Sequence, residues 1–240
     1  MLIPIVVSLD LITNILFFMS AALLKKLLDA PDLPQLMEQA NIQLEAENER
    51  RKEFREWITP GIKAEFINGE VILHSPVKRG HLRCSGNLFK LLDTFVAIKN
   101  LGETSYDKGL IALTRNDYEP DICFWGNEKA ANFTDETMLH PAPDFVVEVL
   151  SKKTAKFDRT IKFQDYAIHG IPEYWIIDPW IQTIEQYWLE YIPDQAYALV
   201  AKWRVGDHIN CRAVEGFSIP VEAVFDKKAC SETLKSLLSA

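Results

Sequence analysis

Three charged residues stand in segments where the surrounding sequence predicts regular, packed structure. Glu148 interrupts the apolar stretch "PDFVVEVLS" at residues 143–151, which is typical of a buried strand. Asp121 opens a second apolar stretch, "DICFW", directly after Pro120. Lys162 follows Glu148 by fourteen residues, in the segment "DRTIKFQDYAIHG", whose periodicity predicts a helix. The sequence therefore offers two acids on strands and one lysine on a helix.

Burial of an ionised carboxylate without a partner is unfavourable by several kcal/mol, so Glu148 should face a cation or a hydrogen-bond donor. If Asp121 and Glu148 lie on neighbouring strands with Lys162 above them, they form a hard-oxygen site suited to Mg²⁺ or Mn²⁺. Such an ion polarises a phosphodiester, and the lysine can orient the attacking water. Taken singly, the three residues also have ordinary interpretations: a salt-bridged acid, an acid in a turn and a solvated helix lysine.

The composition is that of an ordinary globular protein. The chain has 240 residues, 48% of them hydrophobic, and a net charge of −8. A polyanionic partner would therefore need a local basic patch. The segment "KKTAKFDRTIK" at residues 152–162 is the most basic part of the chain, and it predicts either phosphate contacts or a solvated loop and helix start. The four cysteines form no CxxC pair, which indicates reduced thiols and a cytoplasmic protein.

Three parts follow one another along the chain: a hydrophobic extension at residues 1–30, a charged helix at residues 31–58 and a domain at residues 59–240. The first 24 residues are apolar enough to span a bilayer, but they contain Asp10 and Asn14 and lack a signal-peptide pattern. A docked helix or an upstream start explains them at least as well, so membrane attachment by residues 1–24 is not favoured.

The pattern of elements predicts an α/β fold. Asn68-Gly69 between two apolar runs indicates a hairpin, and residues 102–126 read as two or three strands. The order strand, helix, strand across residues 144–178 predicts a right-handed crossover between parallel strands. Two helical faces are expected to be apolar: Leu82, Phe89, Leu92 and Val96 within residues 79–99, and Phe157, Ile161 and Ile168 on the crossover helix, whose polar stripe is Asp158, Lys162, Asp165 and His169 and whose end is Gly170.

The segments "EPDICFW", "APDFVVEVLSKKT" and "DRTIKFQDYAIHGIPEYWIIDP" resemble the Uma2 family, also called DUF820, of restriction-type endonucleases. The hairpin "AEFINGEVILHSP" and the helix start "RGHLRCSGNL" are also similar to that family, so the resemblance covers roughly residues 60–225. It implies a restriction-endonuclease-like PD-(D/E)XK core, with a mixed central sheet flanked by helices and an N-terminal helical extension. It also implies a metal-dependent endonuclease that hydrolyses DNA and leaves a 5′-phosphate.

The resemblance implies that Asp121 and Glu148 bind the metal, together with the backbone carbonyl of Val149. A standard E-x-K motif would place lysine at position 150, where this chain has Leu150. Lys162 from the following helix takes that role, and Lys152 at the strand exit is the alternative donor. We prefer Lys162 because a helix packed over the sheet can direct its polar stripe at the acids.

Further candidates surround this set. Glu65 and Glu70 flank the hairpin turn and could close the metal site, although solvated side chains are the favoured interpretation for both. His81 could be a general base or a structural histidine, and Tyr166 and Asp178 are expected to be structural neighbours of the site. A homodimer is plausible for an enzyme that cuts two strands.

Two other classes of function remain open. Leu150 and the negative net charge favour a catalytically inactive module that binds nucleic acid or protein on a nuclease scaffold. A membrane-tethered regulatory protein depends on residues 1–24 alone.

Overall fold

The computed structural model describes residues 22–190 and 196–239, and the chain divides into two units, Met1–Glu53 and Phe54–Ala240. Helix α2, Leu33–Trp57, begins in the first unit and ends in the second. Its bounds lie within the charged helix that the sequence predicted at residues 31–58. In the described part of the chain no helix is both long and apolar enough to cross a bilayer, and residues 1–21 of the predicted apolar segment lie outside it.

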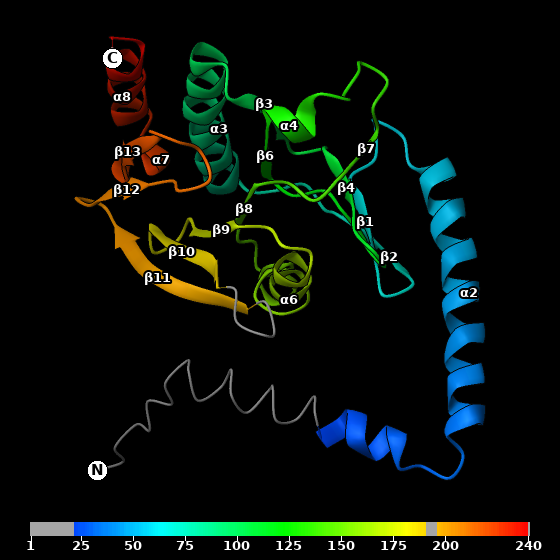
Figure 1. Cartoon of the computed structure of the whole chain (residues 1–240). Coiled ribbons are helices and arrows are strands. Elements are labelled where there is room, and N and C mark those ends of the chain that lie inside the picture. The colour runs from blue at the N-terminus through cyan, green and yellow to red at the C-terminus, as the bar shows by residue number, and fades with distance from the viewer. Residues whose placement is uncertain (1–21, 191–195, 240) are drawn as a thin grey trace, which may run out of the picture. The chain divides into compact units, whose positions relative to one another are not determined.

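A six-stranded mixed sheet forms the centre of the larger unit (Figure 1). Its strands, in spatial order, are β11 (Ala196–Arg204), β10 (Thr183–Glu190), β9 (Glu173–Asp178), β8 (Phe145–Val149), β6 (Ile122–Gly126) and β3 (Gly102–Tyr106). Strands β8 and β9 pair in parallel and the other neighbours pair antiparallel. The predicted parallel pair at residues 144–178 is confirmed, and β10 and β11 pair antiparallel.

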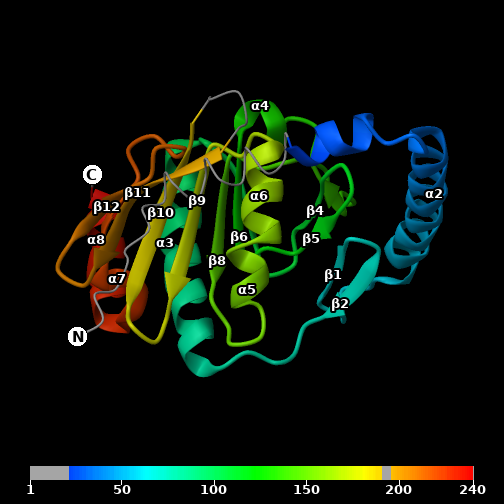
Figure 2. The ribbon, with the colours of Figure 1, turned by 90° about the horizontal axis from the view of Figure 1, so that it is seen from below.

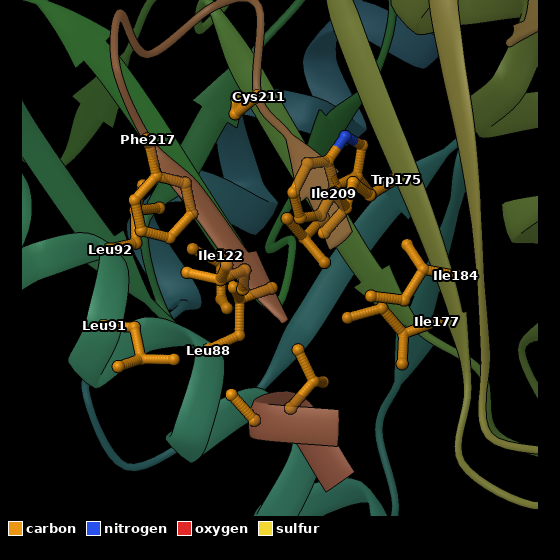
Figure 3. Close-up of a cluster of buried hydrophobic side chains, with 14 of the residues drawn as sticks. Leu88, Leu91, Leu92, Ile122, Trp175, Ile177, Ile184, Ile209, Cys211 and Phe217 are labelled. Carbon is orange, nitrogen blue, oxygen red and sulfur yellow. The ribbon is translucent and has the colours of Figure 1, made fainter. Parts of the chain in front are cut away.

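Helices cover both faces of this sheet, with α3 on one face and α6 on the other (Figure 2). The first face is covered by α3 (Arg79–Lys99), α7 (Glu222–Phe225) and α8 (Lys227–Ser239), and the second by α5 (Ala155–Asp158) and α6 (Ile161–Ile168). On the first face, Leu88, Leu91 and Leu92 of α3 pack against Ile122 and Trp175 of the sheet (Figure 3). The sheet is therefore apolar on both sides, as the apolar runs of its central strands require.

The remaining strands form a second sheet and a small ribbon. The second sheet contains β2 (Glu70–Leu73), β1 (Ala64–Ile67), β5 (Asp117–Tyr118), β4 (Leu110–Ala112) and β7 (Leu139–His140); the ribbon pairs β12 (His208–Asn210) with β13 (Ser218–Pro220), and α4 (Asn127–Ala130) follows β6. Residues 102–126 thus contain four strands, where the sequence predicted two or three. The additional one, β5, has only two residues, which is too short for a visible alternation.

The hairpin β1–β2 turns at Asn68 and Gly69, whose φ angles are 50° and 85°. Both angles are positive, as the predicted Asn-Gly turn requires. Gly170 ends the crossover helix with φ 71°, also as predicted. Two residues of the predicted apolar stripes are exposed instead: Leu82, near the start of α3, and Ile168, in the last turn of α6. Each lies beside the buried face of its helix: His81 and Cys84 are buried next to Leu82, and Ala167 is buried next to Ile168.

One charged cluster joins the crossover to the outer strands. The Arg159 guanidinium binds the Glu185 carboxylate through both terminal nitrogens, and Lys202 Nζ and Tyr187 Oη donate to the same carboxylate at 2.9 and 3.0 Å. Burial alone would raise the pKa of Glu185, but these donors hold it at about 2. Since this pKa lies below the ordinary value, the ionised carboxylate stabilises the fold above pH 4.5 and ceases to do so as the pH falls towards 2.

Glu185→Gln should therefore lower the free energy of unfolding at pH 7 by about 1.5–3 kcal/mol, the range for hydrogen bonds to charged groups. The difference from the wild type should shrink between pH 4.5 and pH 2, as the native carboxylate becomes protonated. Urea unfolding across this pH range measures it, with Glu190→Gln on the exposed end of the same strand as control. A destabilisation that does not change with pH would contradict the electrostatic origin.

Candidate active site

The structure brings Asp121 and Glu148 to facing positions on two adjacent strands. Ile122 of β6 pairs with Val147 of β8, so the same antiparallel register extended by one residue sets Asp121 opposite Glu148. Both carboxylates line one cavity, and burial together with the charge of Asp121 raises the pKa of Glu148. The backbone N–H of Val149 donates to Asp121 Oδ2 at 2.8 Å, which fixes the aspartate beside the neighbouring strand.

Glu148 points to the sheet face that α6 covers. The side chains of β8 alternate: Val147 and Val149 pack with α3, whereas Val146 and Leu150 pack on the side of Tyr166 in α6. Glu148 belongs to the second set by the two-residue period of a strand. The acid in this buried strand therefore has a polar partner on the helix that covers the strand.

That group is the ammonium of Lys162, which is 1% exposed. Its Nζ lies 2.9 Å from Glu148 Oε1, 2.8 Å from Glu65 Oε1 and 3.5 Å from Asp158 Oδ1. Burial alone would lower the pKa of Lys162, but the carboxylates of Glu148, Glu65 and Asp158 raise it well above the ordinary value. Lys162 is therefore a permanently charged centre, and the helix lysine preferred from the sequence is the one that contacts Glu148.

Glu65 corrects one expectation from the sequence. It was predicted to be solvated, but it is 1% exposed and binds Lys162. Its Oε1 also accepts the backbone N–H of Glu119 at 3.0 Å, and its Oε2 lies 3.1 Å from His74 Nε2. Burial alone would raise the pKa of Glu65, but Lys162 and His74 hold it at about 2. The strand β1 presents Glu65 inwards because the hairpin packs against the site, a tertiary contact that its own sequence does not reveal.

The two facing acids have different surroundings. Asp121 Oδ2 lies 3.1 Å from His81 Nε2, and Oδ1 accepts a hydrogen bond from Lys63 Nζ at 3.2 Å. Burial opposes ionisation, but the His81 hydrogen bond and the Lys63 charge keep the pKa of Asp121 well below its usual range. His81 thus contacts the acid through Nε2, while its Nδ1 is buried without a hydrogen-bond partner in the described residues.

Glu148 is less easily ionised than Asp121. Burial raises its pKa; Lys162 lowers it in part, and the charges of Asp121 and Glu65 raise it further. Tyr166 Oη donates to Glu148 Oε1 at 2.9 Å, so Lys162 and Tyr166 hold the same oxygen. Tyr166 is therefore a structural neighbour of the acid, as the sequence suggested.

A cavity of about 430 Å³ opens onto the acid pair. Glu119, Asp121 and Glu148 lie along its wall, and Glu119, whose pKa burial raises to about 7, is an acid that the sequence reading missed. Its position two residues before Asp121, in "EPD", was the available signal. Lys63, which directly precedes the hairpin, was missed as well, since nothing in its local sequence points to Asp121.

The other predicted residues lie further from the acids. Lys152 lines the cavity and is exposed, so the structure places it at the rim. Glu70 is exposed on β2 and does not line the cavity, in agreement with its favoured solvated interpretation. Asp178 ends β9, where its Oδ1 accepts the backbone N–H groups of Trp180 and Ile181 and so shapes the following turn.

The acid pair fits a divalent ion as a two-carboxylate site. Within the described residues, no three His, Cys, Asp or Glu side chains are grouped to hold a metal by themselves. Mg²⁺ is commonly bound through one or two carboxylates, with water and substrate phosphate oxygens as the other ligands. The repulsion from Asp121 that raises the pKa of Glu148 is also what a shared dication would relieve. The Val149 carbonyl remains an expected ligand, while its N–H is already committed to Asp121.

The chain is similar to known proteins in sequence and in fold. The sequence model of the Uma2 family, described as "Putative restriction endonuclease", matches residues 51–222. The uncharacterized protein sll1609 of Synechocystis sp. is 32% identical over 128 residues, which are 52% of this chain and 71% of that protein. The crystal structure of "a putative nuclease belonging to DUF820" from Anabaena variabilis has a TM-score of 0.61 and 16% identity, and the match covers 75% of this chain and 97% of that one.

The chain therefore belongs to the Uma2 family, and its fold is the mixed α/β fold of the DUF820 structure from Anabaena variabilis. Both the family and the fold predicted from the sequence are confirmed.

Removal of the Lys162 ammonium should show how much it contributes to the free energy of unfolding. Lys162→Met leaves Glu148 and Glu65 buried without their shared cation, and this should lower the free energy of unfolding by about 3–5 kcal/mol. Urea unfolding followed by far-UV circular dichroism measures the loss. Lys152→Met, at the exposed rim, is the matched control and should change stability by less than about 0.5 kcal/mol. Equal small effects of the two changes would show that Lys162 is not the partner on which these acids depend.

Proposed function

We propose that the protein is a metal-dependent endonuclease that hydrolyses DNA phosphodiester bonds. The observation that carries this proposal is that the neighbouring acids Asp121 and Glu148 line one cavity together with Lys162, whose ammonium contacts Glu148. Membership of the Uma2 family supports it.

In this proposal Asp121, Glu148 and the Val149 carbonyl hold Mg²⁺ or Mn²⁺. When bound, the ion supplies Lewis-acid polarisation of the phosphodiester and neutralises charge that develops on its oxygens. Lys162 orients Glu148 and, from the same cavity wall, donates to the attacking water. Lys63 and His81 hold Asp121 in place and keep it ionised.

The rim of the cavity supports a polyanionic substrate. Lys78, Lys152 and Lys153 are exposed and line the cavity, so positive charge gathers at the opening of an otherwise acidic protein. Clustered lysines of this kind provide the sequence-independent part of affinity for a phosphate backbone. The predicted phosphate contacts of the segment 152–162 are thus proposed for its first two lysines.

The catalytically inactive binding module is the second candidate. It is favoured by the three groups that already contact the Asp121 carboxylate, from Lys63, His81 and Val149. These groups occupy part of the space around the carboxylate oxygens that a metal ion would need. Metal binding and cleavage separate the two candidates.

Asp121→Asn and Glu148→Gln should each lower the rate of supercoiled plasmid nicking in Mg²⁺ or Mn²⁺ by about 100-fold or more, the order expected when electrostatic stabilisation of a transition state is lost. Far-UV circular dichroism should remain that of the wild type. Glu70→Gln on the exposed strand β2 is the control and should nick normally. Nicking that survives both changes would reject the proposed site.

Mn²⁺ binding tests the metal separately from the reaction. Isothermal titration of the full chain should show one site, and Glu148→Gln should weaken its affinity at least about tenfold, because half of the carboxylate pair is neutralised. Glu70→Gln should titrate as the wild type does. A wild type that binds no Mn²⁺ but retains DNA in EDTA would establish the inactive binding module instead.

A further inference from the structure

A half-exposed tryptophan stands at the cavity that holds the acid pair. Trp180, in the turn between β9 and β10, is 49% exposed and lines the cavity. The exposed part of this aromatic side chain adds nothing to folding, since the stabilisation from apolar surface comes from its removal from water. Its position at the mouth of a polar site instead suits contact with a ligand.

The turn that carries Trp180 is fixed. Asp178 Oδ1 accepts the backbone N–H groups of Trp180 and Ile181 at 2.9 and 3.2 Å. Pro179 lies close to Gly80 at the start of α3. A Cβ atom built on Gly80 would lie 3.9 Å from the Cβ atom of Pro179. The next residue of α3 is His81, which contacts Asp121. The tryptophan is therefore tied, through one short series of contacts, to the acid that is proposed to bind the metal.

The cavity has more room and more apolar wall than a phosphate group requires. Its volume of about 430 Å³ lies within the usual range for small-molecule sites. Its lining includes the apolar side chains of Leu73, Val77 and Trp180 as well as the acids and the rim lysines. A whole nucleotide matches this mixed lining, because its phosphate needs charged groups and its base needs a flat apolar surface.

We propose that Trp180 is a base-stacking residue and that the substrate is a DNA strand with an unpaired nucleotide beside the scissile phosphate. The proposal rests on the proposed nuclease function and specifies its substrate class as single-stranded or locally unpaired DNA. In an intact duplex each base is paired and stacked between its neighbours, so its face is closed to an aromatic side chain unless the strand is opened. Aromatic stacking on exposed bases accepts any sequence, because every base has a π face.

Binding without catalysis tests this assignment. Fluorescence anisotropy in EDTA should show that the full chain binds a labelled single strand of about 16 nucleotides, near the upper site size of single-strand modules, more tightly than the same sequence as a blunt duplex. Trp180→Ala should weaken single-strand binding about tenfold and leave duplex binding unchanged, whereas Trp180→Phe should retain most of the affinity. Ile181→Ala, one residue further along the same turn and 59% exposed, is the matched control and should bind as the wild type does.

Intrinsic fluorescence gives a second readout. The single strand should quench tryptophan emission of the full chain, and this quenching should fall in Trp180→Phe, because a stacked indole is the quenched group. Equal affinities for the two DNA forms, or a Trp180→Ala effect that is absent or the same on both, would overturn the stacking role. Nicking that depends on Asp121 and Glu148 while Trp180 is without effect would reject this inference alone. Selective single-strand binding through Trp180, with nicking that ignores both acids, would reject the nuclease and retain the stacking site.

Discussion

The ammonium group of Lys162 is the interaction on which the site depends. It stands between Glu148 on β8 and Glu65 on β1, with Asp158 of α5 also within reach. Buried acids at such separations repel one another strongly in a medium of low polarisability, and an uncompensated charge there is unfavourable by several kcal/mol. One cation from α6 therefore joins the crossover and the preceding strand β8 to the hairpin, which is distant from both in sequence.

This arrangement makes the two facing acids unequal. Asp121 is served by Lys63, His81 and the Val149 N–H and is ionised readily, whereas burial and neighbouring negative charge resist the ionisation of Glu148. Lys162 and Tyr166 both donate to Oε1 of Glu148, and neither donates to Oε2. A carboxylate fixed through one oxygen keeps its orientation without committing the other. The sheet register and the helix lysine thus pre-organise the pair before any ligand arrives.

Features set by local sequence were predictable, and those set by contacts between distant elements were not. The Asn68-Gly69 turn, the parallel crossover and the placement of Lys162 follow from turn chemistry and from strand and helix periods. Glu65 could not be recognised as buried, because its environment arises only when the hairpin docks beside α6. Lys63 escaped notice for the same reason. Leu82 shows the opposite error: it was placed on the apolar face of its helix, but it is exposed beside the buried His81 and Cys84, so the real buried face is displaced from the predicted one.

The negative net charge does not argue against a nucleic-acid substrate once the distribution of charge is known. Electrostatic effects between exposed groups fade beyond about 10 Å at 0.1 M ionic strength, so a phosphate at the cavity mouth responds mainly to nearby residues. Those include Lys78, Lys152 and Lys153. The remaining acids of a chain with net charge −8 would instead disfavour contacts elsewhere on the surface. In the proposed function the lysines would therefore attract the backbone without reading it, and the apolar wall with Trp180 would decide which strand geometry can enter.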